Sequence, residues 1–353
     1  MNRWLSVAFA FIFAACAPDQ SGSEGSASGS GSVDLTGAGA TFPYPLYSKW
    51  FADYATAKGV RINYQSIGSG GGIRQFSEGT VDFGASDSPM KDDEIAKAKG
   101  PVLHIPTVLG AIAITYNLPE LSAPLKLTGD VLADVFLGKI KKWNDPRLAA
   151  SNPGVKLPGS DILVVHRSDG SGTTFVFTDY LAAVSPAWVA GPGRGKEVPW
   201  PVGLGGKGNE GVAGQVKQTP GAIGYVELAY AKQNRLAFAA IRNSAGQFVL
   251  PSPAGMTAAA AAVAKALPAN TDYRISIVNA PDAASYPISS FTWILAYAQQ
   301  ADSVKGRKLV DFLRWALTEG EKQAASLDYA PLPESMLTNL QGRLDSIKIG
   351  TTP

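Results

Sequence analysis

Apolar and polar positions follow two different periods along the chain, and this pattern predicts an α/β protein. Strand-forming residues cluster at 60–65 and again at 161–165. Apolar residues recur at helical spacing within 46–59, a stretch that closes with a glycine of the kind that commonly ends a helix. Residues 175–184 also read as a helix. Because strand-like and helix-like stretches alternate, we expect sheets flanked by helices.

Three turns rich in Gly, Ser and Thr each precede a predicted helix: GAGATFPYP (37–45), GSGGGIRQF (68–76) and HRSDGSGTT (166–174). In the first turn, Pro43 is expected to be the first helical residue. A helix start exposes unpaired N–H groups and the positive end of a dipole, so it attracts anions. One such turn alone is better explained as an ordinary N-cap. Three with matching chemistry favour an anion site, provided that they converge in the fold.

Two charged positions sharpen this hypothesis. Arg167 lies in the third turn, and its planar guanidinium can donate two hydrogen bonds to an oxyanion. Asp169, two residues later, could accept from Arg167 and fix the orientation of the guanidinium. The alternative is a surface ion pair of little energetic value. Asp87 ends a short apolar strand in DFGASDSP (82–89), where a carboxylate is also typical of a turn or cap.

The N-terminus predicts a targeting segment. Residues 1–15 carry Arg3 and an apolar stretch too short to span a bilayer, and the small residues before Cys16 resemble a bacterial lipobox. Cys16 is therefore predicted to be the lipidated first residue of the mature protein, with ordinary cleavage after Ala15 as the alternative. The Gly/Ser-rich remainder of 16–32 predicts a flexible linker.

Composition narrows the function classes. With 31 basic and 29 acidic residues the net charge is +2, so the chain lacks the excess of positive charge that is typical of nucleic-acid-binding proteins. A single cysteine excludes a disulfide within the chain and a thiolate metal cluster. No metal or other cofactor is predicted.

Several longer stretches resemble a known family: GAGATFP, YQSIGSGGGIRQ, VDFGASDSPM, HRSDGSGTTFVFTDYL and WPVGLGGKGNEGVAGQV, among others. On these motifs the chain resembles the phosphate-binding proteins of bacterial high-affinity phosphate ABC importers, over nearly its whole mature length. The resemblance implies an α/β, two-lobed periplasmic binding protein of type II. Each lobe would be a mixed sheet flanked by helices, with the ligand in the cleft between them.

The resemblance also implies a ligand set, carried over residue by residue. One lobe would bind phosphate through Thr41, Phe42, Ser69 and Asp87. The other would use Arg167, Ser171, Gly172 and Thr173, with Asp169 supporting Arg167. His166 alternates to the opposite face of the strand from Arg167 and is expected to be structural.

Asp87 gives this ligand set its selectivity. A carboxylate that faces an anion repels it unless the ligand donates a proton. Phosphate carries such a proton near neutral pH and sulfate does not, and an unrelieved contact between two buried acceptors costs several kcal/mol. Selectivity would then come from a penalty on the wrong ligand.

The expected organisation follows from the same resemblance. After the signal peptide (1–15) and the anchored linker (16–32), lobe 1 comprises 33–106 and 288–347, lobe 2 comprises 107–287, and 348–353 form a tail. Crossings between the lobes are predicted at 105–110 and 286–291. The protein would be a periplasmic, membrane-anchored monomer that delivers phosphate to a permease and its ATPase.

Other function classes fit the sequence less well. The chief alternative is a secreted phosphatase or another oxyanion-handling enzyme, but no G-x-S-x-G elbow occurs and the chain has only two histidines, His104 and His166. A nucleotide-binding protein is disfavoured because GLGGKG (203–208) lacks a Ser or Thr after Lys207. A surface adhesin or phosphate sensor on the same fold is a third alternative.

Overall fold

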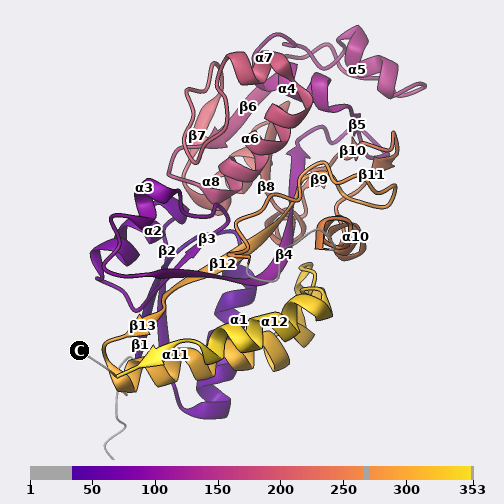
Figure 1. The fold of residues 1–353 in the computed structure, drawn as a ribbon. Coiled ribbons are helices and arrows are strands. Elements are labelled where there is room, and N and C mark those ends of the chain that lie inside the picture. Colours follow the sequence, from indigo (N-terminus) through magenta and orange to yellow (C-terminus); the bar gives the residue numbers. More distant parts are fainter. Residues whose placement is uncertain (1–33, 265–270, 351–353) are drawn as a thin grey trace, which may run out of the picture. The chain divides into compact units, whose positions relative to one another are not determined.

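One long mixed sheet runs through the protein. The computed structural model describes residues 34–264 and 271–350. Strands of the main sheet follow the order β2-β1-β3-β12-β4-β8-β6-β7, with β9 also paired to β4 (Figure 1). These strands are β1 (Leu35–Gly39), β2 (Ile62–Ser66), β3 (Phe83–Ser86), β4 (Val102–Tyr116), β6 (Leu163–Arg167), β7 (Leu204–Gly206), β8 (Ala222–Glu227), β9 (Ala237–Phe238) and β12 (Ser289–Tyr297).

Two small sheets complete the β-structure. One has the order β11-β10-β5 and the other pairs β13 with β14. Their strands are β5 (Lys126–Leu127), β10 (Ala240–Arg242), β11 (Phe248–Val249), β13 (Gln299–Gln300) and β14 (Lys348–Ile349). The predicted signal peptide, Cys16 and linker lie outside the described residues.

The main sheet has two ends, which belong to two lobes (Figure 1). The first lobe holds β1, β2 and β3, and the second holds β6, β7 and β8. Strand β4 connects them, because it pairs with β12 up to Ala111 and with β8 from Ile112 onward. The predicted crossings fall in β4 and around the start of β12, whereas the lobe boundaries themselves stay a prediction. One buried apolar cluster extends through both lobes.

Helices cover both lobes. Those of the first lobe are α1 (Tyr44–Lys58), α2 (Ser69–Glu78), α3 (Asp92–Ile95), α11 (Ser303–Trp315) and α12 (Glu334–Asp345), with a π-helical turn at Ala316–Gly320 and a 3₁₀ segment at Glu321–Leu327. Those of the second are α4 (Gly129–Phe136), α5 (Pro146–Ser151), α6 (Gly172–Val184), α7 (Pro186–Ala190), α8 (Gly208–Gln218), α9 (Leu228–Gln233) and α10 (Pro253–Ala264).

The helices after the three turns form where the sequence predicts them, with small differences. Helix α1 ends at Lys58 and is capped by Gly59, whose φ of 70° is the left-handed conformation that favours glycine. It begins at Tyr44, so Pro43 is the N-cap and not the first helical residue. Helix α6 is buried on most of its sides, since Val176, Phe177 and Leu181 all lie in the core. It is covered by the sheet and by neighbouring helices.

Strand direction explains why the turns meet. Strand β1 runs parallel to β2 and β3, and β6 runs parallel to β7 and β8. Helices α1, α2, α6, α8 and α9 follow the carboxyl ends of five of these strands. In α/β sheets the carboxyl ends are where ligands bind, because helix N-termini gather there. Strand β4 runs in the direction of β3 and opposite to β8, so the carboxyl ends of the first lobe's strands face those of the second lobe. Helix starts from both lobes therefore meet between the lobes.

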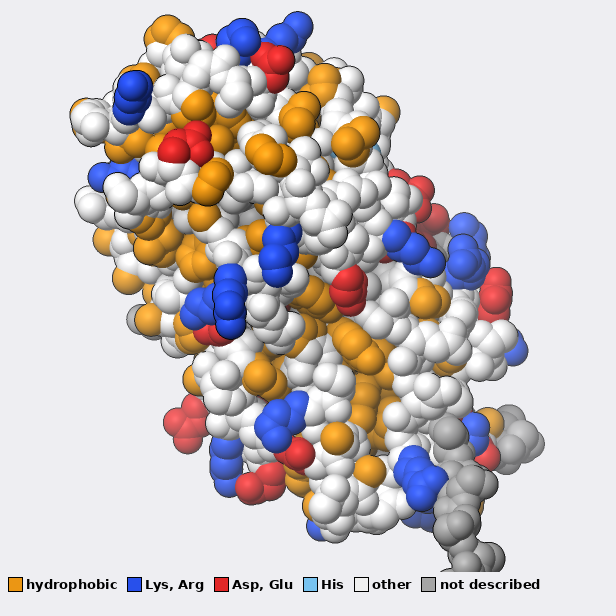
Figure 2. All heavy atoms as spheres, turned by 180° about the vertical axis from the view of Figure 1, so that it is seen from behind, with side chains coloured by type: hydrophobic (Ala, Val, Ile, Leu, Met, Phe, Trp, Pro, Cys, Tyr) orange, Lys and Arg blue, Asp and Glu red, His pale blue; other side chains and the backbone are white. Residues whose placement is uncertain are grey.

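The surface shows no single-sign field on the face in Figure 2, where Lys, Arg, Asp and Glu side chains are interspersed. This agrees with the small net charge of +2. Within the described residues, no helix has both the length and the apolar character needed to cross a bilayer.

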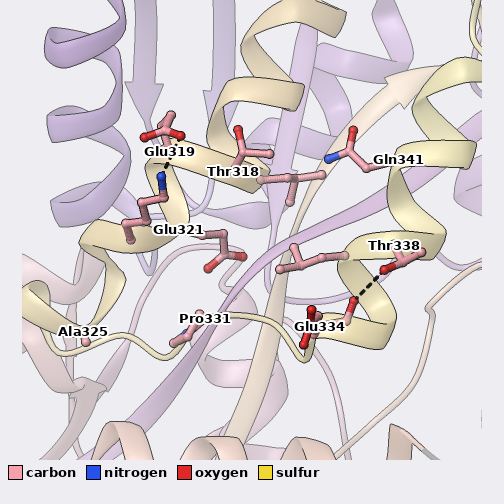
Figure 3. A pocket seen from close by; sticks show the side chains of 11 residues that line it. Thr318, Glu319, Glu321, Ala325, Pro331, Glu334, Thr338 and Gln341 are labelled. Atoms are coloured by element: carbon pink, nitrogen blue, oxygen red, sulfur yellow. Dashed lines mark hydrogen bonds and ion pairs between the residues drawn. The ribbon is translucent and has the colours of Figure 1, made fainter.

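A hollow of about 620 Å³ lies in the first lobe, between the 316–327 turns and α12. Figure 3 shows Thr318 and Glu319 on one side of it and Thr338 and Gln341 on the other. Glu321 lies within its lining and is buried. Its Oε1 accepts a bond of 3.4 Å from the Leu332 N–H, and its Oε2 has no partner in the structure. Burial raises the pKa of Glu321 to about 8.

This buried carboxyl predicts a pH-dependent stability. Between its ordinary pKa of 4.5 and about 8, the unfolded chain ionises Glu321 while the folded chain keeps the proton. The free energy of unfolding therefore falls as pH rises through this window. We expect Glu321→Gln to match the parent near pH 4.5 and to be more stable by on the order of a few kcal/mol at pH 8.5.

Urea unfolding across this pH range measures the effect. The exposed neighbour Glu319, paired with Lys322 at 2.7 Å, supplies the control Glu319→Gln, which should keep the parent's pH dependence. If the free energy of unfolding changed with pH in the same way in Glu321→Gln and in the parent, the raised pKa assigned to Glu321 would be contradicted.

Candidate functional site

The first lobe supplies four of the residues selected from the sequence. Thr41 and Phe42 form the turn between β1 and α1, Ser69 is the first residue of α2, and Asp87 directly follows β3. All four are at most 3% exposed. The α2 N-cap, Gly68, has no side chain to cap the helix. The N–H groups of the first turn of α2 are therefore not used by a capping side chain.

The second lobe supplies the cation. Arg167 is the last residue of β6, and its side chain is 1% exposed. Its Nε donates to Asp169 Oδ1 at 2.8 Å and its Nη2 to Asp169 Oδ2 at 2.5 Å. Burial opposes ionisation of Asp169, but the hydrogen bonds and charge of Arg167 outweigh it and lower the pKa of Asp169. The pair is buried and bidentate, so the surface alternative is wrong.

The start of α6 supplies further donors. Ser171 is its N-cap, and its Oγ accepts from the Thr174 N–H at 3.0 Å. Its own hydroxyl hydrogen therefore stays available to another acceptor. Gly172 and Thr173 are the first two helical residues, where N–H groups have no partner within the helix. All three residues are buried.

These two sets of residues meet. The Gly70 N–H donates to the Gly170 carbonyl at 2.8 Å, which joins the second turn to the third. A Cβ placed on Gly172 would lie 2.4 Å from both Asp87 Oδ2 and Ser69 Oγ. The side chains of Asp87 and Ser69 lie so close to the Gly172 backbone that a side chain at position 172 would have to displace them. The structure thus brings together the sequence-predicted residues of both lobes.

An ion pair also joins the lobes beside this site. Lys196 Nζ lies 2.5 Å from Glu94 Oε1, with both side chains mostly buried. The Lys196 carbonyl accepts from the Ser171 N–H at 3.0 Å. The loop that carries Lys196 is therefore tied to α3 and to the start of α6.

Asp87 is a carboxylate that lies among these donors without a hydrogen bond to Arg167. Its Oδ1 accepts from the Thr292 hydroxyl at 2.9 Å, and Ser69 Oγ lies 3.5 Å from its Oδ2. Burial raises the pKa of Asp87 to about 7, against the opposing effects of Thr292 and of the Arg167 charge. Oδ2, which has only the long Ser69 contact, is the oxygen that faces Gly172.

The sequence-based reasoning missed three residues that hold the 41–42 turn. Tyr230, from α9, donates to the Thr41 carbonyl at 2.6 Å, and Tyr329 donates to the Phe42 carbonyl at 2.6 Å. Asn209, from α8, donates through Nδ2 to Thr41 Oγ1 at 2.7 Å. The stretch GLGGKGN, which ends in Asn209, lies within one of the motifs that carry the family resemblance, but no ligand-site role was predicted for Asn209. Its position after a short glycine-rich strand was the available signal.

His166 has the structural role expected of it. Its ring stacks on Trp200 with 4.8 Å between the ring centroids, and its Nδ1 bonds the Arg167 carbonyl at 2.9 Å. Both contacts are with other parts of the second lobe.

The site suits a small, tetrahedral oxyanion that carries a proton. Helix N-termini, hydroxyls and the Arg167 guanidinium offer hydrogen-bond donors, and the Asp87 carboxylate offers an acceptor. Among the described residues, no group of three or more His, Cys, Asp and Glu side chains is arranged to hold a metal ion.

Comparison with known proteins agrees with this fold. A family model described as the PBP superfamily domain matches residues 23–319. The chain is 48% identical over 316 residues to the phosphate-binding protein PstS of Pasteurella multocida, covering 88% of this chain and 89% of that protein. It is 41% identical to the protein of the same name from Methanocaldococcus jannaschii, covering 84% and 82%.

A similar solved structure is that of a high-affinity periplasmic phosphate-binding protein, PfluDING, bound with phosphate. It superimposes with a TM-score of 0.71 at 22% identity and covers 90% of this chain and 96% of that one. The likeness supports the two-lobed α/β fold. The chain belongs to the PBP superfamily and, within it, to the PstS family of phosphate-binding proteins.

Proposed function

We propose that the protein captures inorganic phosphate with high affinity outside the cytoplasm and delivers it to the membrane permease of an ABC importer. A cytoplasmic ATPase would drive the transport. The observation that carries this proposal is the buried meeting of Arg167, Asp87 and the start of α6. Phosphate-binding proteins at 46–48% identity over most of the chain give independent support.

The proposed ligand contacts follow from the site. Phosphate would accept from Arg167, from backbone N–H groups at the helix starts and from nearby hydroxyls, and it would donate its own proton to Asp87. Asp169 supports Arg167 without touching the ligand. The proposed phosphate-binding residues are Thr41, Phe42, Ser69, Asp87, Arg167, Ser171, Gly172 and Thr173.

Ligand enclosure would involve movement of the lobes about the strands that connect them. We propose the lobe boundaries 33–106, 107–287 and 288–347. Bonds that join the lobes only when they are close together, such as Gly70 to Gly170, would then form with the ligand. The protein would act as a monomer.

The proposed location depends on the N-terminus. A signal peptide at 1–15 would direct export, and lipidation of Cys16 would tether the protein to a membrane through the 16–32 linker. Radiolabelled palmitate incorporated by the parent, but not by Cys16→Ser, would support the anchor.

Binding without catalysis is the proposed activity. Relatives at 46–48% identity are named binding proteins, so the phosphatase alternative gains no support from them. Release of p-nitrophenol from its phosphate ester, with and without divalent metals, tests this point directly.

Replacing the cation tests the site. Arg167→Ala removes the charge that faces the ligand and leaves Asp169 without its partner. We expect phosphate affinity to fall by about 100-fold or more, since charge-assisted bonds to a buried anion are strong. Calorimetry at pH 8 measures the change. Arg147→Ala, at an exposed ion pair with Asp134, is the control and should bind as the parent does. An unchanged affinity in Arg167→Ala would remove this residue from the site.

Asp87 predicts that ligand selectivity depends on pH. With the pKa of Asp87 raised to about 7, the group is an ionised acceptor at pH 8 and becomes a neutral donor at lower pH. Sulfate has no proton to offer, so we expect no sulfate binding at pH 8 and measurable binding near pH 5.5. Competition calorimetry across this range should show that the preference for phosphate over sulfate decreases as the pH is lowered through about 7. A constant preference, or comparable affinities at pH 8, would contradict the assigned role.

Gly172 predicts a steric block to closure. In Gly172→Ala the new methyl group would meet Asp87 and Ser69, so the lobes could not approach fully and phosphate affinity should fall at least about 10-fold. Gly214→Ala is the matched control, because nothing lies within 4 Å of its Cβ position in α8. The control should bind normally and unfold at slightly higher urea. Normal binding by Gly172→Ala would show that the close approach is dispensable.

A further inference from the structure

Asn209 stands at the centre of a hydrogen-bond network that spans the site. It is the second residue of α8 in the second lobe and is fully buried. One Nδ2 hydrogen bonds Thr41 Oγ1 at 2.7 Å and the other bonds Thr173 Oγ1 at 3.1 Å. One amide group thus contacts a hydroxyl from each lobe.

The orientation of this amide is fixed by the backbone. Asn209 Oδ1 accepts from the Glu227 N–H at 2.9 Å. Because a backbone N–H can only donate, the oxygen must face it, and the NH₂ group must face the two threonines. A flipped amide would place two donors against each other.

The network uses up the acceptor capacity of both hydroxyls. Thr173 Oγ1 accepts from Asn209 and also from Arg167 Nη1 at 3.2 Å. Thr41 Oγ1 accepts from the Asn209 side chain and, at 3.3 Å, from the Asn209 backbone N–H. A hydroxyl has two lone pairs and one hydrogen. Each oxygen is therefore left with only its hydrogen to offer.

Neither hydroxyl hydrogen is taken up by the protein. Across residues 34–264 and 271–350, no protein acceptor is bonded by the Thr41 or the Thr173 hydroxyl, although both residues are at most 3% exposed. Buried hydroxyls normally find acceptors. An anion between the lobes would supply one to each.

We propose that Asn209 is a positioning residue, which turns the hydroxyls of Thr41 and Thr173 into fixed hydrogen-bond donors aimed at the bound phosphate. This inference rests on the proposed function. Without Asn209, each hydroxyl can rotate and donate elsewhere, and its orientation must be fixed again when phosphate binds. Asn209 thereby favours a ligand that presents acceptors on both sides, which a fully or mostly deprotonated oxyanion does.

Phosphate titration calorimetry of Asn209→Ala and Asn209→Asp at pH 8 tests the proposal. We expect Asn209→Ala to bind phosphate about 10- to 100-fold more weakly than the parent. Asn209→Asp keeps the size of the side chain but presents an acceptor, so both hydroxyls would donate to it and turn away from the ligand. Its affinity should be lower still. A role in packing alone predicts the reverse order of the two variants.

A double-mutant cycle separates hydroxyl orientation from charge and from tethering of the lobes. If Asn209 acts through the hydroxyls, Asn209→Ala should cost much less affinity in a Thr173→Val background than in the parent. Thr173 and Asn209 belong to the same lobe, so a simple tether between the lobes through Thr41 predicts additive effects. Additivity in this cycle would overturn the proposal.

Asn152 provides the matched control. It is a buried asparagine whose amide is also fully bonded. Its Oδ1 accepts from the Lys126 N–H, and its Nδ2 donates to the carbonyls of Lys126 and Leu148. Asn152→Ala should lower the urea midpoint as a buried amide loss does, yet bind phosphate like the parent. A parent that fails to bind phosphate would refute the proposed function. Binding by the parent, with equal affinity in Asn209→Ala, would refute the role of Asn209 alone.

Discussion

A buried guanidinium and a buried carboxylate that share one small space impose the main constraint on this protein. Arg167 is stable there because Asp169 accepts from its Nε and Nη2 in a bidentate pair. Part of the positive charge and the Nη1 group remain available to other groups in the site. Asp87 is held nearby without a cation of its own, and burial raises its pKa. Charges buried in this way need a complementary partner. A proton-carrying oxyanion satisfies both groups at once.

The sheet topology makes that constraint achievable. Parallel strands within each lobe end on the same side, and the strands of the two lobes run in opposite directions, so helix starts that are far apart in sequence face one another. Glycine then allows a close approach where a larger residue would clash, most clearly at Gly172, whose backbone lies against the side chains of Asp87 and Ser69. Within the first lobe, Tyr329 holds the Phe42 carbonyl, whereas the bonds of Tyr230 and Asn209 to Thr41 join the two lobes and would form as they close.

Local chemistry explains which features could be predicted from the sequence. The three turns, the helices behind them and the Arg167–Asp169 pair follow from capping and from short-range spacing. Motif resemblance supplied the ligand set and the two lobes. Asn209, Tyr230 and Tyr329 could not be found in this way, since they contact the 41–42 turn across 168 to 287 positions of sequence. The extent to which α6 is buried could not be predicted either, because the elements packed around it decide which of its faces are covered.

The most direct measurement is a crystal structure of the protein grown with phosphate at pH 8. The account predicts one phosphate between the lobes, with an oxygen at hydrogen-bond distance from Asp87 Oδ2 and others near Arg167 and the start of α6. A phosphate bound elsewhere, or one in this cleft with Asp87 turned away from it, would contradict the central role given to the proton shared between ligand and carboxylate.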